Sequence, residues 1–279
     1  MSLLPDQIDI LLPRTGVRMR GLVSQPRSGA ARRDVTLVFL HFFGGSSRSW
    51  RPVMNELAGE FPCVALDLRG SGRTDLAAGA DEVANYGLDA LVGDVTAALG
   101  QLRPGRYALV GHSMGGKVAL AAAADHSGAP GLEALVLLAP SLATPEPMPD
   151  AERARLLAGH GSAVAVRETL SQVTAQELRP EVLQTALEDG LAVRAAAWRA
   201  WLERGSRQDI SARLERVRVP VHLLAGEKDA NMTPRLLRRE IAAYLPEAFA
   251  RDPETVSGAA HLLPLEAPGA VAAFIRRAL

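Results

Sequence analysis

The chain has 279 residues, 48% of them apolar, and its 31 basic and 31 acidic residues leave a formal net charge of +0. A chain of this length buries a large core without a disulfide or a metal, and its neutral charge argues against a general binder of nucleic acid or of anionic membranes. The single cysteine, Cys63, excludes an internal disulfide and a cysteine-based metal cluster, and no secretory signal or membrane-spanning run is visible, so we expect a soluble, cytoplasmic protein.

Short apolar runs recur along the chain, followed by glycine-containing turns and Ala/Leu-rich stretches. This alternation predicts a mainly parallel sheet covered by helices on both faces. The first two runs are more polar and predict an antiparallel edge, whereas the uninterrupted apolar runs suit strands buried on both faces. The expected strands are 7–12, 18–24, 34–41, 63–67, 107–111, 134–139, 222–225 and 254–256. The expected helices are 50–58, 88–99, 114–124, 234–244 and 268–277.

The rhythm of the sequence changes between Pro140 and Pro220. Residues 151–214 have helical apolar spacing and no strand signal. Because ligands bind beyond the carboxyl ends of the strands in such sheets, an insertion after the sixth strand is expected to cover a site. The simpler alternative is a helical subdomain that only adds stability. The predicted units are a core of residues 1–140 and 220–279 and a helical cap of residues 141–219.

The motif at 111–116, Gly-His-Ser-Met-Gly-Gly, follows an expected strand and precedes an Ala-rich helix. This context is typical of a nucleophile elbow, in which a sharp turn strains the serine backbone and exposes its hydroxyl. Glycines at 111 and 115 remove side chains that would collide at the bend. The amino terminus of the helix points free N–H groups at a developing anion. Ser113 is therefore the candidate nucleophile, and the alternative is a glycine-rich helix start with a serine N-cap.

A serine hydroxyl needs a neighbouring base to take its proton. Among the six histidines, His261 lies on a loop after the last expected strand and before the final helix, which suits a base reaching across the sheet. The other five fit different roles: loop geometry for His41, a turn position with poor reach for His112, the core for His222, and exposed stretches for His126 and His160.

The base in turn needs an acid that fixes its tautomer. The loop after the seventh expected strand contains Glu227 and Asp229, and both precede His261, in the order serine, acid, histidine. Asp229 is preferred, and Glu227 is the fallback, with a solvated loop carboxylate as its simpler interpretation. The oxyanion needs backbone donors, one of which should be the N–H of Met114 and the other an N–H of the loop 41–47.

These segments resemble the α/β-hydrolase fold family, in particular bacterial lid-bearing esterases, with haloperoxidase-like perhydrolases and C–C bond hydrolases close by. The resemblance covers essentially the whole chain and rests on 41–47 with Trp50, on 67–75, on the elbow, on 226–229 and on 258–264. It implies a mostly parallel eight-stranded sheet with a helical cap inserted after strand 6. It also implies a catalytic triad of Ser113, Asp229 and His261, with the backbone N–H groups of Phe43 and Met114 as oxyanion donors.

The chain departs from this family at Phe42, where a glycine usually follows the loop histidine. A bulky ring there is expected to narrow the pocket or to shift the oxyanion loop. The segment 69–72 is structural in the family and is assigned no catalytic role. A serine at the elbow also excludes the dehalogenases and epoxide hydrolases of this fold, which use aspartate at that position.

The expected reaction is acyl transfer on a small or medium apolar ester, without cofactor or metal, because phosphate-loop and metal-ligand spacings are absent from the sequence. Phe42, Trp198 and Trp201 are candidate substrate contacts, although the tryptophans could equally anchor the cap. The arginines of the cap either meet an acidic substrate or form a solvated face; they are Arg194, Arg199, Arg204 and Arg207.

Two other functions remain open. The same triad can cleave a C–C bond, hydrolyse a thioester or lactone, or make peracids, and the fold does not decide among these reactions. The other alternative is a hydrolase-derived protein that binds a ligand without turning it over.

Overall fold

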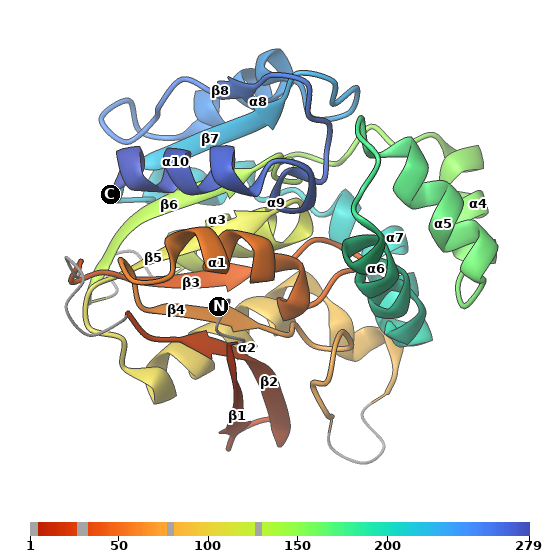
Figure 1. Ribbon diagram of the computed structural model, residues 1–279, viewed down its shortest axis with the longest axis horizontal. Coiled ribbons are helices and arrows are strands. Elements are labelled where there is room, and N and C mark those ends of the chain that lie inside the picture. Colours follow the sequence, from red (N-terminus) through yellow and green to blue (C-terminus); the bar gives the residue numbers. More distant parts are fainter. Residues whose placement is uncertain (1–4, 27–32, 77–80, 126–129) are drawn as a thin grey trace.

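A computed structural model describes residues 5–26, 33–76, 81–125 and 130–279. Its centre is an eight-stranded sheet in the order β1-β2-β4-β3-β5-β6-β7-β8 (Figure 1). β1 pairs antiparallel with β2, and β2 pairs antiparallel with β4, whereas the remaining neighbours are parallel. The antiparallel edge predicted from the two polar runs is therefore confirmed. The strands are β1 (Asp6–Leu12), β2 (Val17–Ser24), β3 (Thr36–Leu40), β4 (Cys63–Leu66), β5 (Tyr107–His112), β6 (Leu132–Leu138), β7 (Val221–Gly226) and β8 (Glu254–Val256).

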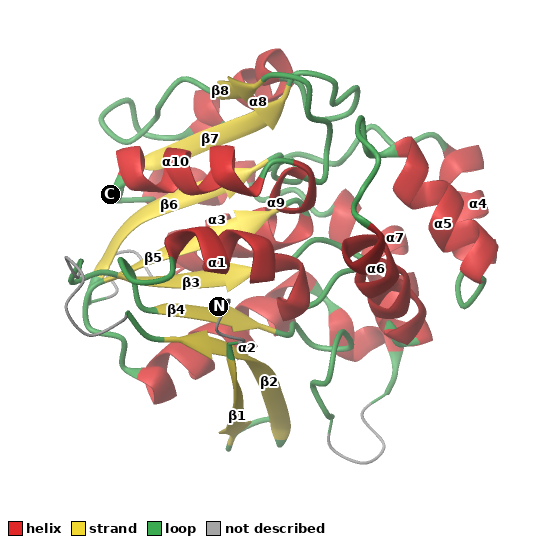
Figure 2. Ribbon diagram, in the orientation of Figure 1, coloured by secondary structure: helices red, strands yellow, loops and turns green. Residues whose placement is uncertain are grey.

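Helices cover both faces of the sheet (Figure 2). The α-helices are α1 (Arg51–Leu57), α2 (Leu88–Leu102), α3 (Met114–Asp125), α4 (Asp150–Ala158), α5 (Ala163–Gln172), α6 (Pro180–Ala192), α7 (Ala195–Glu203), α8 (Pro234–Glu240), α9 (Leu263–Glu266) and α10 (Pro268–Ala278). The 3₁₀ helices are η1 (Ser47–Trp50), η2 (Val83–Tyr86), η3 (Gly205–Arg207), η4 (Ser211–Arg216) and η5 (Ala242–Tyr244). α1 contacts α10 in front of the sheet, and α2 contacts α3 behind it. Within the described residues, no helix combines the length and the apolarity needed to cross a bilayer.

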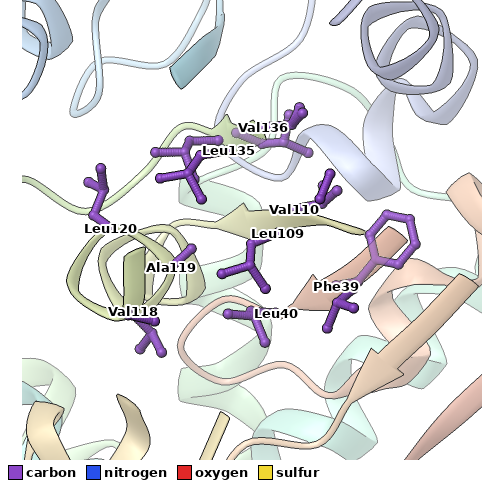
Figure 3. Close-up of a cluster of buried hydrophobic side chains, with 14 of the residues drawn as sticks. Phe39, Leu40, Leu109, Val110, Val118, Ala119, Leu120, Leu135 and Val136 are labelled. Carbon is purple, nitrogen blue, oxygen red and sulfur yellow. The ribbon is translucent and has the colours of Figure 1, made fainter. Parts of the chain in front are cut away.

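The parallel strands β3, β5 and β6 form the centre of the core together with α3 (Figure 3). Their uninterrupted apolar runs are buried on both faces, as the sequence predicted, and Phe39, Val110 and Val136 are fully buried. α3 is buried along all of its length except Asp125, because its alanines and glycines let the helix lie close against the strands. This packing holds the ends of β3 and β5, and hence the loops that follow them, in a fixed relation.

Helices α4 to α7 follow β6 and lie beyond the carboxyl ends of the parallel strands (Figure 1). They pack on the loops of the sheet through apolar clusters that include Phe42, Val166 and Leu262. The two ends of the segment 141–219 do not pack in these clusters. Leu142 at one end and Leu214 at the other are buried in the main hydrophobic core of the sheet. The assignment of this segment as a separate cap stays a prediction.

One predicted helix ends earlier than its apolar pattern suggests. The expected helix 234–244 is divided into α8 and η5, because Ile241 has φ of −132° and ψ of −64°, which breaks the α-helical path. Ile241 is fully buried in the main core. Packing of this side chain therefore competes with the continuous helix that local spacing favours.

Candidate active site

Ser113 lies at the turn between β5 and α3 in a left-handed backbone conformation, with φ of 50°. Such a conformation is costly for a residue other than glycine, so neighbouring bonds have to hold it. The Ser113 N–H donates to the carbonyl of Leu138 at 3.0 Å, and its carbonyl accepts from the N–H groups of Gly116 at 2.8 Å and Ser141 at 2.9 Å. The turn therefore has the strained geometry that the elbow motif predicts.

His261 and Asp229 are joined by a hydrogen bond of 2.7 Å between Nδ1 and Oδ2. The other carboxylate oxygen of Asp229 accepts from the N–H groups of Asn231 at 2.9 Å and Met232 at 3.0 Å. Burial acts to raise the pKa of Asp229, but these hydrogen bonds, chiefly the one from His261, outweigh it and lower the pKa. An ionised Asp229 holds the proton on Nδ1, which leaves Nε2 of His261 free to act as a base.

The ring of His261 lines the same cavity as Ser113. Among the described residues no hydrogen bond joins the Ser113 hydroxyl to this ring, and such bonds often tighten only when substrate binds. Glu227, the fallback acid, is exposed and accepts instead from Ser257 Oγ at 3.1 Å and the N–H of Gly258 at 2.8 Å. The geometry thus brings together Ser113, His261 and Asp229 and leaves Glu227 outside the group.

The neighbouring histidines have structural roles. His41 donates from Nδ1 to the carbonyl of Phe42 at 2.7 Å and accepts from the N–H of Leu68 at 3.0 Å, which agrees with the predicted role in loop geometry. His112 Nε2 donates to the carbonyl of His261 at 2.8 Å. Burial, followed by the nearby charge of His261, lowers the pKa of His112 to about 3, so this ring is neutral at pH 7.

For the three remaining histidines, the sequence predicts exposed stretches for His126 and His160 and a core position for His222. His160 is half-buried, not exposed, because its Nε2 donates to the carbonyl of Val193 at 2.8 Å and its ring lies 5.6 Å from that of Trp198. His222 is half-buried in β7 beside Phe274, close to the core position expected. His126 lies outside the described residues.

The loop after β3 orients one of the two candidate oxyanion donors. The carbonyl of Phe42 accepts from His41 Nδ1 at 2.7 Å and from the N–H of Gly45 at 3.0 Å. In a trans peptide the N–H points opposite to the carbonyl, so the N–H of Phe43 points away from these two partners. Neither the N–H of Phe43 nor that of Met114 makes a hydrogen bond within the described part of the chain.

The unusual Phe42 ring is buried between the oxyanion loop and helices α5 and α6. Its centroid lies 5.2 Å from that of His112. A Cβ at position 45 would lie 2.8 Å from the Phe42 ring, so Gly45 provides the space that the ring occupies. The departure from the family pattern at 42 is therefore accommodated by a glycine three residues later.

The cavity beside Ser113 has a volume of about 470 Å³ and is lined mainly by apolar side chains. Phe42, Trp198 and Trp201 all line it, and their contact with substrate stays a prediction. Trp198 also anchors the helical segment, because its Nε1 donates to the carbonyl of Leu156 at 2.8 Å and its ring lies 4.3 Å from that of Phe43. No Arg or Lys is found among the described residues that line the cavity.

The four arginines named for the helical segment lie outside the cavity. Three of them are exposed and paired with exposed carboxylates: Arg194 with Asp81, Arg199 with Glu203, and Arg207 with Asp150. Arg204 is exposed as well. These side chains form a solvated face, so the acidic-substrate interpretation of them is not supported.

Near the serine turn, a fully buried lysine and a half-buried glutamate have no signal in the sequence. Lys117 is fully buried and Glu146 lines the cavity, and neither Lys117 Nζ nor Glu146 Oε1 has a hydrogen-bond partner among the described residues. Burial lowers the pKa of Lys117 to about 8, opposed by the charges of Glu146 and Asp209. Burial also raises the pKa of Glu146, opposed first by a hydrogen bond with Ser141.

Ion pairs hold the loops around the cavity. Arg69 donates to both carboxylate oxygens of Asp94 at 2.7 and 2.6 Å, which is consistent with a structural role for 69–72. Asp189 of α6 is buried and accepts from Ser46 Oγ at 2.7 Å and from Arg48 Nε at 2.9 Å. The second pair joins the helical segment directly to the oxyanion loop, and sequence reasoning missed it because its partners are distant in the chain.

The described side chains do not form a metal-binding site. Over the ranges that the structure describes, three or more His, Cys, Asp or Glu side chains nowhere gather in a way that could hold a metal ion.

Similar proteins place the chain in a family. "Protein PHYLLO, chloroplastic" of Arabidopsis thaliana is 24% identical over 87% of this chain, but the match spans only 15% of that protein. The 2-succinyl-6-hydroxy-2,4-cyclohexadiene-1-carboxylate synthase of Salmonella heidelberg (strain SL476) is 30% identical over 75% of this chain and 82% of its own length. The crystal structure of carboxylesterase CesB (YbfK) from Bacillus subtilis has a TM-score of 0.76 at 20% identity, covering 99% of this chain and 92% of that one.

The family itself is shown by a match over most of the chain. Residues 37–274 match the alpha/beta hydrolase family. This match agrees with the eight-stranded sheet and with the hydrolase class expected from the sequence. The chain therefore belongs to the alpha/beta hydrolase family.

Proposed function

We propose that this protein is a serine hydrolase that cleaves a small or medium, neutral carboxylic ester through an acyl-enzyme. The observation that carries the proposal is the 2.7 Å hydrogen bond between His261 Nδ1 and Asp229, beside the same cavity that the strained Ser113 lines. A serine, a base and an orienting acid in this arrangement are the parts that acyl transfer needs.

In the proposed reaction, Ser113 Oγ attacks the ester carbonyl while its proton moves to Nε2 of His261. The N–H groups of Phe43 and Met114 stabilise the oxyanion of the tetrahedral intermediate. The bond to the alcohol then breaks, and the alcohol leaves with the proton from His261. Water repeats the sequence on the acyl-enzyme, which releases the acid and restores the Ser113 hydroxyl.

The preference for a neutral ester rests on the lining of the cavity. Its walls are mainly apolar, it contains the carboxyl-bearing Glu146, and it has no Arg or Lys among the described lining residues. Transfer of a carboxylate-bearing group into such surroundings lacks a compensating partner and is unfavourable. We expect activity to rise with acyl length until the cavity of about 470 Å³ is filled, and then to fall.

We also propose that residues 141–219 act as a cap over this cavity. Side chains from α4, α5, α6 and α7 all line it, among them Leu156, Leu170, Ala186 and Trp198. A cavity enclosed in this way excludes water from the reacting atoms. The cap assignment accounts for the position of the helices beyond the strand ends better than a purely stabilising subdomain does.

A second candidate, C–C bond or lactone chemistry on the same triad, stays open because the fold does not decide among these reactions. The Salmonella synthase, which is similar over 75% of this chain, has a name that specifies neither reaction. The name of that protein specifies a carboxylate, whereas the described lining here offers no cation to such a group. Parallel assays on a neutral ester series, a neutral lactone and a neutral 1,3-diketone separate the reactions, with the ester series expected to give the highest kcat/KM.

The decisive test is the intact mass after treatment with a fluorophosphonate, with Ser113→Ala as the control. We expect one phosphonyl group on the parent and none on the variant, followed by turnover of neutral esters. Absence of labelling would refute the proposal. A ligand that raises the melting temperature of an unlabelled protein without being consumed would point instead to the binding-protein alternative.

A further inference from the structure

The backbone on both sides of His261 is bonded to the carboxylate of Glu266 on α9. Oε1 of Glu266 accepts from the N–H of Leu262 at 3.0 Å, and Oε2 accepts from the N–H of Ala260 at 3.2 Å. These two N–H groups lie on either side of His261 in the chain. Because a charged acceptor binds more strongly than a neutral one, the carboxylate fixes the peptides that determine where the imidazole points.

The same carboxylate bonds the turn between α5 and α6. Glu266 Oε2 accepts from the N–H of Ala175 at 2.7 Å and from that of Gln176 at 3.3 Å. The N–H of His261 itself donates to the carbonyl of Val173 at 3.1 Å. Three consecutive backbone N–H groups, from residue 260 to 262, are thus held by Glu266 or by the 173–176 turn.

Two further contacts complete the connection. Gln176 Nε2 donates to the carbonyl of Gly258 at 3.1 Å, at the start of the histidine loop. Asp189 of α6 in turn bonds Ser46 and Arg48, in and just after the oxyanion loop. The segment 141–219 is therefore bonded to the loop of the base and to the loop of an oxyanion donor.

We propose that Glu266 is a positioning residue for His261 and that it couples the 173–176 turn to the base. In the catalytically competent arrangement, the turn and the histidine loop form one hydrogen-bonded unit. Displacement of the turn removes one acceptor, the carbonyl of Val173, and one donor, Nε2 of Gln176, from the His261 loop, and so moves the base away from Ser113. The inference rests on the proposed function, because it concerns the base of that reaction.

The test compares three variants with the parent: Glu266→Ala, Glu266→Gln and Gln176→Ala. The control is Glu240→Gln, because Glu240 also accepts from the segment 141–219, through Thr144 Oγ1 at 2.7 Å. It makes no hydrogen bond to the histidine loop within the described residues. We expect Glu266→Ala to lower kcat about 10- to 100-fold, since a misplacement of about 1 Å costs on the order of 10² in rate.

KM should change little in Glu266→Ala, because Glu266 does not line the cavity. Glu266→Gln should have a kcat between those of Glu266→Ala and the parent. Its amide oxygen still accepts a hydrogen bond, but its NH₂ group is a donor and cannot bond to the N–H groups that it faces. Gln176→Ala should lose a few-fold of kcat, because it removes only one neutral hydrogen bond. Glu240→Gln should keep the parent kcat.

Two measurements distinguish positioning from a general loss of stability. The first is the strongly downfield proton resonance of the His261 Nδ1–H bond to Asp229, which should broaden or vanish in Glu266→Ala and remain in Glu240→Gln. The second is hydrogen exchange, which should accelerate together in 260–262 and 173–176. If Glu266→Ala does not fold, Glu266→Gln and Gln176→Ala decide the question by the same readouts.

The inference is overturned if the folded Glu266 variants keep kcat within about threefold of the parent, or lose kcat while the resonance and both exchange rates stay unchanged. Fluorophosphonate labelling separates this failure from failure of the proposed function. A parent labelled at Ser113 with unaffected Glu266 variants refutes only the coupling. An unlabelled parent refutes the serine hydrolase itself.

Discussion

Gly115→Ala is expected to damage the oxyanion site by a backbone collision. A Cβ at this position would lie 2.2 Å from the carbonyl oxygen of Leu40 and 2.7 Å from that of His41. Ordinary van der Waals contact begins at 3.4 Å, so α3 and the end of β3 have to separate by about 1 Å. No side chain rotation relieves this collision, because the atoms that are struck belong to the backbone.

The separation acts on both proposed oxyanion donors. Met114 directly precedes the substituted residue, and Phe43 follows the end of β3 by three positions. Moving one N–H by about 1 Å relative to the other misaligns both with the oxyanion, at a cost of about 10² to 10³ in kcat. The added methyl also overpacks the core, which should lower the free energy of unfolding by about 1–3 kcal/mol.

The assay is kcat on a neutral ester together with urea unfolding. Gly93→Ala is the matched control, because Gly93 lies in α2 with open space around its Cβ position. Alanine there should raise the free energy of unfolding by about 1 kcal/mol through helix propensity and leave kcat unchanged. A Gly115→Ala enzyme with kcat within threefold of the parent and an unchanged urea midpoint would refute the reasoning.

Three further predictions follow from the site. Asp229→Asn should lower kcat by about 10⁴-fold with the fold retained, because the ring of His261 loses the acceptor that sets its tautomer; rates within tenfold of the parent would contradict this role. Asp189→Ala should lower the free energy of unfolding in urea by about 1.5–3 kcal/mol, because it removes buried charge-assisted hydrogen bonds. The control Asp150→Ala breaks only an exposed ion pair and should lower the free energy of unfolding by less than about 1 kcal/mol. The pKa of His112, lowered by burial to about 3, makes the folded protein bind fewer protons than the unfolded chain between pH 3 and pH 6.5. This histidine should therefore make stability fall by about 1.4 kcal/mol per pH unit as pH decreases through that window. His112→Gln should reduce the slope of acid-unfolding curves without abolishing it, because burial also lowers the pKa of His41 and of His222; an unchanged slope would place the titrating group elsewhere.

The sequence alone determined the architecture of the core, because apolar runs and turn residues act on the segment of chain that contains them. Uninterrupted apolar runs such as the one ending at Leu40 are explained by burial on both faces of one strand, and the structure places them at the centre of the sheet. The elbow at Ser113 is likewise a local requirement for small residues at a sharp turn. The roles of Ser113, Asp229 and His261 follow from this pattern as predictions, and the structure adds the bond between the last two.

Tertiary structure decided how the catalytic loops are supported. Ser46 and Asp189 lie 143 positions apart in the chain, and Ala175 and Glu266 lie 91 apart, so no periodicity or motif connects them. The buried Lys117 likewise follows from packing, since its position in an Ala-rich helix carries no sign of a buried charge. A motif records what one turn of backbone requires, whereas the partner of a buried polar group is chosen by whichever distant segment the fold brings within hydrogen-bonding distance.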